Sequence, residues 1–430
     1  MSARTTATDD VDHPEPAAAA GPGRVAQRPL PADPRRWPGW AQALGIYLLA
    51  RAFSAVVLVL VAQRQVENYW TGARPSYLQF TGLMWDAGWY RQIAEQGYPA
   101  VLPRGADGLV QQNPWAFFPL FPTMVRGVMV VTRGEWYVVA PLVALALGAA
   151  AAVVVRRLVE HGAPRAVAAR PGLPLATVTL LAVFPTAVVL QVAYTESLAL
   201  LLVAVALLLV VERRYLLAAV AVLALGFTRA VALPMAVVVV VHAIVRWRSS
   251  RRGGDPLGAR DLAGLGVLGA TAAVSGVAWP LICGWVTGER DGYLQTQGAW
   301  RGVREIVPFE PWGYVSQFWF GDRAPWVLAA GFGLVLASLL VPAAWRLGNE
   351  LHVWSAAYLL YLTAAVEPGS SLARFLILAF PLGAVTAGLV RRPTVARRAW
   401  TAAVVVLMLG LQVVWVYAMW RLTPPTGWPP

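Results

Sequence analysis

The chain has 430 residues, of which 58% are hydrophobic and only 13% are charged, whereas a soluble globular chain carries about a quarter charged residues. Several apolar runs approach the roughly 20 residues that cross a bilayer, so the composition excludes a soluble protein and predicts an all-α polytopic membrane protein. The net charge is +13. Because the basic residues form short clusters between apolar runs, a pattern that sets membrane topology, we expect no nucleic-acid partner.

Cysteine and histidine are too sparse for a disulfide framework or a zinc site. Cys283 is the only cysteine and lies in an apolar run, which excludes an intramolecular disulfide and a CxxC motif. The four histidines match no ligand spacing and lie at His13, His161, His242 and His352. We predict neither a cofactor nor a bound metal, although these residues alone leave a divalent ion open.

The N-terminal region contains a polar tail and then the first apolar run. Residues 1–38 are rich in Ala, Pro, Asp and Arg without periodicity, which predicts a disordered tail; we expect no cleavable signal peptide. The run 44–62 follows Arg35 and Arg36, so the tail is expected in the cytoplasm. Arg51 lies inside this run, where a charge costs roughly 2.5–3.5 kcal/mol and is usually kept facing protein or water. It is expected to be structural or a second phosphate contact.

The segment 63–135 decides the topology. If residues 115–131 spanned the membrane, the next run, 136–155, would carry its following arginines to the outside, against the rule that basic clusters stay inside. Two prolines in this stretch, Pro119 and Pro122, also each remove a helical hydrogen bond. We therefore predict one long external loop with interfacial helices, one of them over the GWYRQIA run.

With that loop outside, the remaining apolar runs alternate across the membrane. The eleven predicted spans are about 44–62, 136–155, 175–193, 196–211, 215–227, 230–246, 262–285, 326–344, 351–366, 373–390 and 399–420. All basic clusters then lie inside. The unusual polar segments all lie outside, and we interpret them as one composite site: 85–90, 193–197, 227–230, the second large loop 286–325, and 367–375. The membrane domain is expected to cover 39–422, followed by a short tail, 423–430.

Four strings in order resemble the signature of the PIG-V-like mannosyltransferases, relatives of the second mannosyltransferase of GPI-anchor synthesis. They are MWDAGWYRQIAEQGYP with AFFPLFP, then FPTAVVLQVAYTESLALLL, GFTRAVALP and LARFLILAFP, and they cover most of 40–390. The resemblance implies a GT-C fold, a polyprenyl-phosphate-sugar donor and an essential acid in the first external loop. The acceptor would be a glycolipid, glycan or protein. The absence of lysine and the Ala/Val-rich runs indicate a GC-rich bacterial genome, hence a plasma-membrane protein.

Asp86 is the predicted catalytic base. It follows the first span directly, and a positioned carboxylate contributes on the order of 10²–10⁴-fold to proton transfer; the alternative is an N-cap for a helix starting at Ala87. Glu95 and Asp107 are weaker candidates, because one could simply face water and the other could be a turn residue. Many GT-C enzymes carry a second acid here, but Asp86 is followed by Ala87 and Gly88, so we predict no metal.

Arginine is the expected partner of the donor phosphate, because it binds phosphate bidentately and keeps its charge. Arg374 and Arg229 each lie at the external end of a predicted span, with snorkelling to headgroups as the alternative. Glu196 begins a span, where it either complements a helix N-terminus or orients an arginine or binds a sugar hydroxyl. The aromatic neighbours of Asp86 are candidate sugar contacts, although aromatic residues gather at interfaces anyway: Trp85, Trp89 and Tyr90.

The leading hypothesis is thus a membrane glycosyltransferase, a mannosyltransferase by resemblance, with its site facing outside. The alternative is a transporter or flippase of lipid-linked sugars, which would often show internal repeats and ionisable groups near the midplane. A structural membrane subunit is a third option, in which Asp86, Arg229 and Arg374 would all tolerate substitution.

Overall fold

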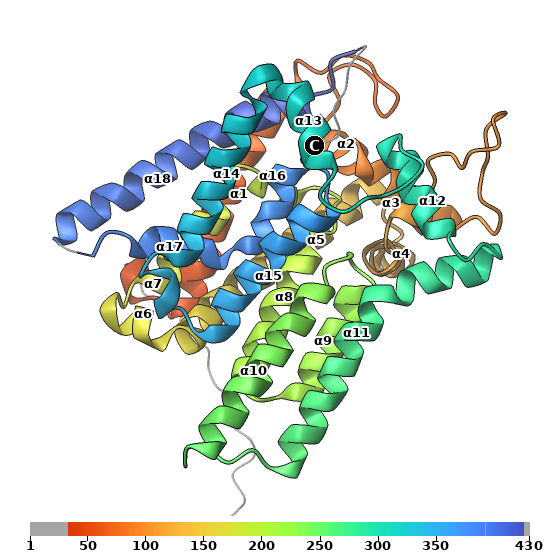
Figure 1. The fold of residues 1–430 in the computed structure, drawn as a ribbon. Coiled ribbons are helices and arrows are strands. Elements are labelled where there is room, and N and C mark those ends of the chain that lie inside the picture. Colours follow the sequence, from red (N-terminus) through yellow and green to blue (C-terminus); the bar gives the residue numbers. More distant parts are fainter. Residues whose placement is uncertain (1–32, 392, 425–430) are drawn as a thin grey trace, which may run out of the picture. The chain divides into compact units, whose positions relative to one another are not determined.

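The computed structural model describes residues 33–391 and 393–424 (Figure 1). The chain divides into two units, Met1–Trp37 and Pro38–Pro430. The only element of the first unit among the described residues is the 3-10 turn Pro34–Arg36. Most of the predicted disordered tail 1–38 lies outside the described residues, as do residues 425–430 of the predicted C-terminal tail 423–430. Within the described ranges every element is helical, apart from one isolated bridge. This confirms the prediction of an all-α protein.

The α-helices of the second unit are, in order, α1 (Gly39–Ala62), α2 (Tyr77–Gly82), α3 (Asp86–Gln96), α4 (Leu120–Thr132), α5 (Trp136–Gly162), α6 (Pro164–Ala169), α7 (Leu173–Ala182), α8 (Glu196–Val211), α9 (Tyr215–Gly226), α10 (Leu233–Arg251), α11 (Ala259–Thr287), α12 (Gly292–Arg301), α13 (Pro311–Phe320), α14 (Ala324–Leu340), α15 (Asn349–Ala365), α16 (Leu372–Phe375), α17 (Pro381–Gly388) and α18 (Thr394–Trp415). Short 3-10 segments connect them at η2 (Pro114–Ala116), η3 (Ala187–Gln191), η4 (Gly321–Arg323), η5 (Ala344–Arg346) and η6 (Leu376–Ala379), and a π-helical turn, η7 (Val416–Trp420), follows α18.

Six helical stretches of the described chain are long and apolar enough to cross a membrane. They are Gly39–Ala62, Trp136–Gly162, Leu233–Arg251, Ala259–Thr287, Pro311–Arg346 and Thr394–Trp420. Their number confirms a polytopic membrane protein. The count of eleven spans stays a prediction, because α8 and α9, with 16 and 12 residues, are shorter than the roughly 20 residues of a full span.

Two predicted spans are broken helices. The run 175–193 contains α7 and η3 with an interruption at Pro185, and the run 373–390 contains α16, η6 and α17, the last beginning at Pro381. Proline cannot donate the helical hydrogen bond and stops a helix from continuing. Irregular backbone at membrane depth is tolerated where protein buries it, and the residues of η3 are buried.

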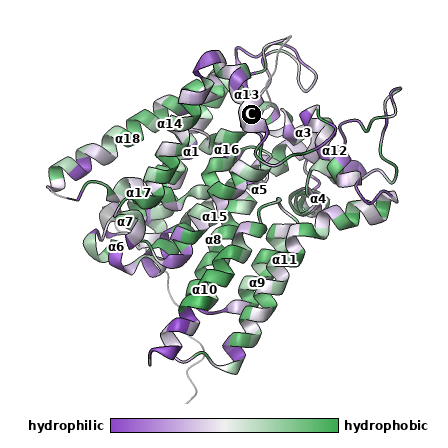
Figure 2. Cartoon of the chain, in the orientation of Figure 1, coloured by the Kyte–Doolittle hydropathy of each residue, from purple (hydrophilic) through white to green (hydrophobic). Residues whose placement is uncertain are grey.

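Helix α5 lies at the centre of the packing, against α1, α7 and α8. Its inward face carries small residues such as Gly148, Ala151 and Ala152, which let neighbouring helices approach closely inside a membrane. Helices α14 and α18 instead expose large apolar side chains, as lipid-facing helices do. Figure 2 shows the long helices apolar along their middles and polar at their ends.

The segment predicted as one long external loop contains α2, α3, η2 and α4. Helix α3 occupies the position expected for the GWYRQIA helix. Helix α4 packs against α3 and α5, and Figure 1 shows it end-on while α5, α8 and α11 run across the picture. It therefore does not lie parallel to the long helices, an arrangement compatible with the predicted interfacial position.

Candidate active site

Four charged side chains from four separate segments meet at one end of the helices. Asp86 is the first residue of α3 and Glu196 the first residue of α8. Arg374 lies in the four-residue helix α16, and Arg229 lies in the short connection between α9 and α10. These four residues, called the charge cluster below, are the catalytic, phosphate-binding and acidic candidates of the sequence, brought together.

The charge cluster alternates acid and base along a chain of contacts. Arg374 Nη1 lies 2.6 Å from Asp86 Oδ2 and 3.5 Å from Glu196 Oε1. Arg229 Nη1 lies 2.6 Å from the same Glu196 oxygen. Because two carboxylates balance two guanidinium groups, the cluster is neutral as a whole, which is how charges are tolerated in a protein interior.

The two acids differ in their access to solvent. The Glu196 side chain is 1% exposed and that of Asp86 is 11% exposed. Glu196 Oε1 holds both guanidinium groups, while its Oε2 accepts no hydrogen bond from the described part of the chain. Glu196 is therefore placed to position the arginines, and Asp86 is the carboxylate with the greater access to solvent.

Hydroxyl and aromatic groups surround the charge cluster. Thr195 Oγ1 accepts a hydrogen bond of 3.2 Å from Arg229 Nη1 and lies 3.3 Å from Tyr90 Oη. Tyr194 Oη accepts one of 3.3 Å from the Asp86 backbone N–H, and the Tyr194 ring lies 4.9 Å from Arg374 Cζ. Burial, with the nearby Asp86 charge adding to it, raises the pKa of Tyr90, so its phenol keeps its proton.

The rings of aromatic residues also flank both guanidinium groups. The Phe375 ring centroid lies 5.0 Å from Arg374 Cζ and 4.5 Å from Arg229 Cζ. A cation over an aromatic face gains on the order of 0.5–2 kcal/mol, more when desolvated. Neither Tyr194 nor Phe375 was among the sequence candidates, although both belong to the polar segments 193–197 and 367–375 that drew attention.

An unusual backbone conformation at Trp85 places Asp86. Trp85 has φ +58° and ψ −128°, a region that residues with a Cβ occupy at a cost of order 1–3 kcal/mol. Its buried indole N–H donates a hydrogen bond of 2.7 Å to the Trp420 carbonyl. The helix consequently starts at Asp86, whose carboxylate makes no capping hydrogen bond and pairs with Arg374 instead, so the predicted N-cap role is not the one it fills.

The aromatic candidates divide by burial. Trp85 and Tyr90 are buried, whereas Trp89 is partly exposed. The Trp89 ring stacks on Phe117 at a centroid distance of 6.0 Å and meets the edge of Trp300 at 5.1 Å. These three contacting rings, Trp89, Phe117 and Trp300, are called the aromatic surface below.

The second large loop reaches this region through α12. Asn113 Nδ2 donates a hydrogen bond of 3.0 Å to Thr296 Oγ1, and Trp300 Nε1 donates one of 3.4 Å to the Asn113 carbonyl. Arg301 Nη2 donates one of 2.9 Å to the Ala365 carbonyl. The polar segments that the sequence assigned to one face are thus in contact, directly or through a neighbour. Asn113, missed by sequence reasoning, opens the NPWAFFPLFP stretch.

The remaining candidates lie outside the charge cluster. Glu95 pairs with Arg91 at 2.9 Å on the exposed side of α3. Asp107 Oδ1 accepts a hydrogen bond of 3.0 Å from the Leu109 N–H, as a turn residue does. Arg51 is buried and donates to the Ala182 and Ala187 carbonyls at the break after α7, so its role is structural.

No group of three or more His, Cys, Asp or Glu residues within 33–391 and 393–424 is arranged to hold a metal ion. In the charge cluster each carboxylate is already paired with arginine. The chemistry available there is proton transfer to a carboxylate and binding of an anion by guanidinium groups.

No protein-family model matches the chain, and no curated protein matches it. Among solved structures it is similar to the oligosaccharyltransferase of Archaeoglobus fulgidus in complex with Zn and sulfate, at 12% identity and a TM-score of 0.47, over 90% of this chain and 54% of that one. The structure of the same enzyme tethered to an acceptor peptide is similar at 11% identity and a TM-score of 0.46, over 90% of this chain and 56% of that one. The archaeal oligosaccharyltransferase AglB from the same organism, in complex with an inhibitory peptide and a dolichol-phosphate, is similar at 10% identity and a TM-score of 0.46. The similarity covers 90% of this chain and 56% of that one. The chain spans about half the length of these proteins.

Proposed function

We propose that this protein is an integral-membrane glycosyltransferase of GT-C type that moves a sugar, mannose by the resemblance of its motifs, from a polyprenyl-phosphate donor to a glycolipid, glycan or protein. The observation that carries the proposal is the buried charge cluster, in which a carboxylate with some access to solvent lies beside two guanidinium groups. Sugar transfer from a lipid phosphate requires both a base and an anion partner, and the cluster contains both.

Asp86 is the proposed base. Its carboxylate takes the proton of the acceptor hydroxyl, the acceptor oxygen forms a bond to the anomeric carbon, and the bond from that carbon to the phosphate oxygen breaks with its electron pair leaving on the phosphate. Proton transfer of this kind contributes on the order of 10²–10⁴-fold. Asp86 is favoured over Glu196 because the Glu196 side chain is almost wholly buried and contacts both arginines.

Arg229 and Arg374 are the proposed partners of the departing phosphate. Arg229 has the more accessible side chain of the two, at 15% exposed against 7%, so we assign it the first contact with the phosphate. Glu196 holds both guanidinium groups in position, and the aromatic surface around Trp89 takes a sugar ring. Arginine suits this role because it keeps its charge and offers several donors.

We place the site on the outer side of a bacterial plasma membrane, with the N-terminus in the cytoplasm. The support is the distribution of charge: the arginine-rich segments lie at the opposite ends of the helices that begin at the charge cluster, as between Glu196 and the Glu212–Arg214 turn of α8. Basic segments stay on the cytoplasmic side.

The test uses the full chain reconstituted in vesicles with radiolabelled polyprenyl-phosphate mannose and a lipid extract as acceptor. We expect transfer by the native protein, a loss of at least 100-fold in Asp86→Asn, and near-normal transfer in Glu95→Gln, a matched acid on the same helix. Undiminished transfer by Asp86→Asn would refute the assignment of the base. Movement of the labelled lipid between leaflets without transfer would instead favour the transporter.

A further inference from the structure

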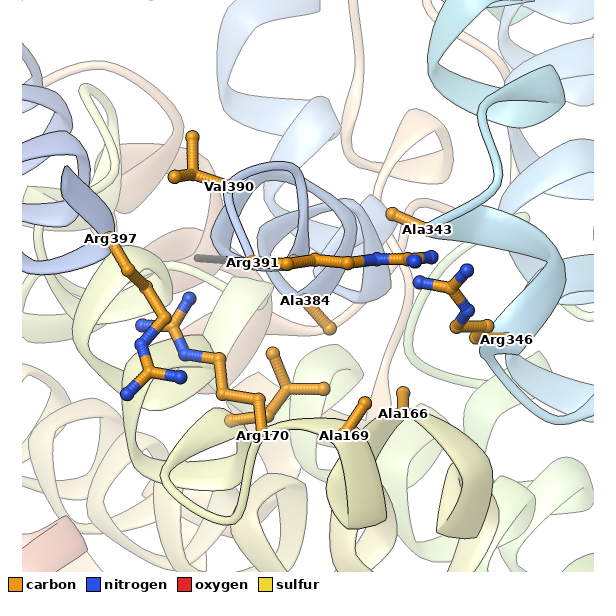
Figure 3. Close-up of a pocket in the computed structure, with 11 residues that line it drawn as sticks. Ala166, Ala169, Arg170, Ala343, Arg346, Ala384, Val390, Arg391 and Arg397 are labelled. Atoms are coloured by element: carbon orange, nitrogen blue, oxygen red, sulfur yellow. The ribbon is translucent and has the colours of Figure 1, made fainter. Parts of the chain in front are cut away.

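A second set of arginines lines a pocket outside the charge cluster. Figure 3 shows it between the loop after α6, the turn η5, the C-terminal end of α17 and the start of α18. Its charged residues are Arg170, Arg346, Arg391 and Arg397, called the arginine pocket below. No residue of the charge cluster lines this pocket, so the two sites are distinct.

No acidic residue lines the arginine pocket. Figure 3 shows the Arg391 side chain extended toward the guanidinium group of Arg346, and Arg397 beside Arg170. Two like-charged pairs therefore face each other across a small hollow floored by alanine. None of the four forms an ion pair with a carboxylate of the described chain.

Some arginines of other basic clusters at this end of the molecule do have acidic partners. Arg157 lies 2.7 Å from Glu212, and Arg246 lies 2.7 Å from Asp261. General enrichment of arginine on the cytoplasmic side would explain positive charge here, but it does not by itself explain why four arginines line one hollow without a carboxylate.

One member of the pocket is held in place. Arg170 donates to the Ala387 carbonyl at the end of α17 and, at 3.2 Å, to Thr401 Oγ1 on α18. Burial and, to a smaller extent, the nearby Arg397 lower the pKa of Arg170. The pocket is thus formed by the α6–α7 loop, η5, the end of α17 and α18, and hydrogen bonds hold the guanidinium group of Arg170 in place.

We propose that the arginine pocket binds a phosphate group, carried either by an anionic phospholipid of the adjacent leaflet or by a small soluble molecule. Guanidinium groups match phosphate oxygens bidentately, and four of them around one hollow supply both the charge and the donors that a phosphate takes. A bound phosphate joins the ends of α7, α17 and α18 and removes the repulsion between the arginines, so binding stabilises this end of the protein.

The test compares the full chain in nanodiscs of phosphatidylcholine alone with nanodiscs that also contain phosphatidylglycerol, and separately titrates pyrophosphate into the first. The readouts are the unfolding temperature and the lipid retained in native mass spectrometry. Arg397→Gln is the test variant, and Arg398→Gln, the exposed neighbour outside the pocket, is the matched control. Both variants remove one positive charge from the same turn of α18.

We expect the anion to raise the unfolding temperature of the native protein and of Arg398→Gln, and Arg397→Gln to need at least a tenfold higher concentration for the same shift. Without any anion, Arg397→Gln should unfold at a higher temperature than the native chain, because repulsion is relieved. If only phosphatidylglycerol raises the unfolding temperature, the ligand is a lipid headgroup. If only pyrophosphate raises it, the ligand is a soluble molecule. Equal loss in both variants, or no response to either anion, would overturn the proposal.

Discussion

Glu196→Gln is the substitution that separates positioning from proton transfer in the charge cluster. It keeps the size of the side chain but removes the negative charge that lies 2.6 Å from Arg229 Nη1 and 3.5 Å from Arg374 Nη1. Arg374 would keep Asp86, Arg229 would lose its carboxylate partner, and the cluster would carry one uncompensated positive charge.

The magnitude follows from burial. Removing one partner of a buried ion pair costs about 3–5 kcal/mol. We expect a value near the lower end, about 3 kcal/mol, because the Arg229 side chain is partly exposed and the glutamine oxygen still accepts a hydrogen bond. Asp86→Asn is expected to cost less, about 1–2 kcal/mol, since Arg374 keeps its contact with Glu196 and Asp86 is nearer to solvent.

The assay measures, for both variants, the thermal unfolding temperature in nanodiscs and the rate of sugar transfer per folded molecule. Glu196→Gln should show the larger fall in unfolding temperature with a raised KM for the donor. Asp86→Asn should show the smaller fall in stability with a loss of kcat. Should the two variants lose stability equally, or should Glu196→Gln lose kcat with KM unchanged, the division of roles between the two acids is wrong.

Three further predictions follow from single contacts. Arg229→Lys keeps the charge but not the planar donor set and should raise the KM for the donor at least tenfold, measured against Arg91→Lys as a surface control. Trp89→Ala should raise the KM for the sugar substrate several-fold, whereas Trp89→Phe should keep the KM near its native value because the ring can still stack on Phe117. Arg51→Met should lower stability by about 2–3 kcal/mol, because two buried carbonyls lose their donor, with transfer per folded molecule unchanged.

The spans that could be predicted are those whose signal is local. Helices α1, α5, α10 and α11 follow apolar runs, and the structure has a long helix at each of them, with ends that differ from the predicted bounds by up to seven residues. The run 175–193 looked equally continuous, yet Pro185 divides it. Hydropathy does not distinguish a broken helix from a straight one, because what satisfies the freed carbonyls here is Arg51, from another helix.

The charge cluster could be named from sequence but not assembled. Topology placed Asp86, Glu196, Arg229 and Arg374 on one face, and each is found at the cluster. Which acid pairs with which arginine could not be predicted from the sequence. Whether an arginine extends to lipid headgroups or is buried in an ion pair depends on which helices pack together. The burial of the aromatic candidates could not be predicted either. The adjacent residues Trp89 and Tyr90 differ in it, because Trp89 stacks on Phe117 at the surface and Tyr90 is buried against Thr195.

The pairing also gives the reason why the roles proposed for the two acids are not interchangeable. A general base must reach the proton it accepts, at about 2.6–3.2 Å between heavy atoms, and Glu196 is enclosed on all sides except toward the arginines it holds. Asp86 has one arginine partner and sits at the start of a helix whose entry is fixed by the strained Trp85 backbone. Neutrality of the cluster needs both acids, and under the proposed function Asp86 is the one that would lose its partner to an incoming phosphate: if Arg374 turned toward that anion, the carboxylate would be released to take the acceptor proton.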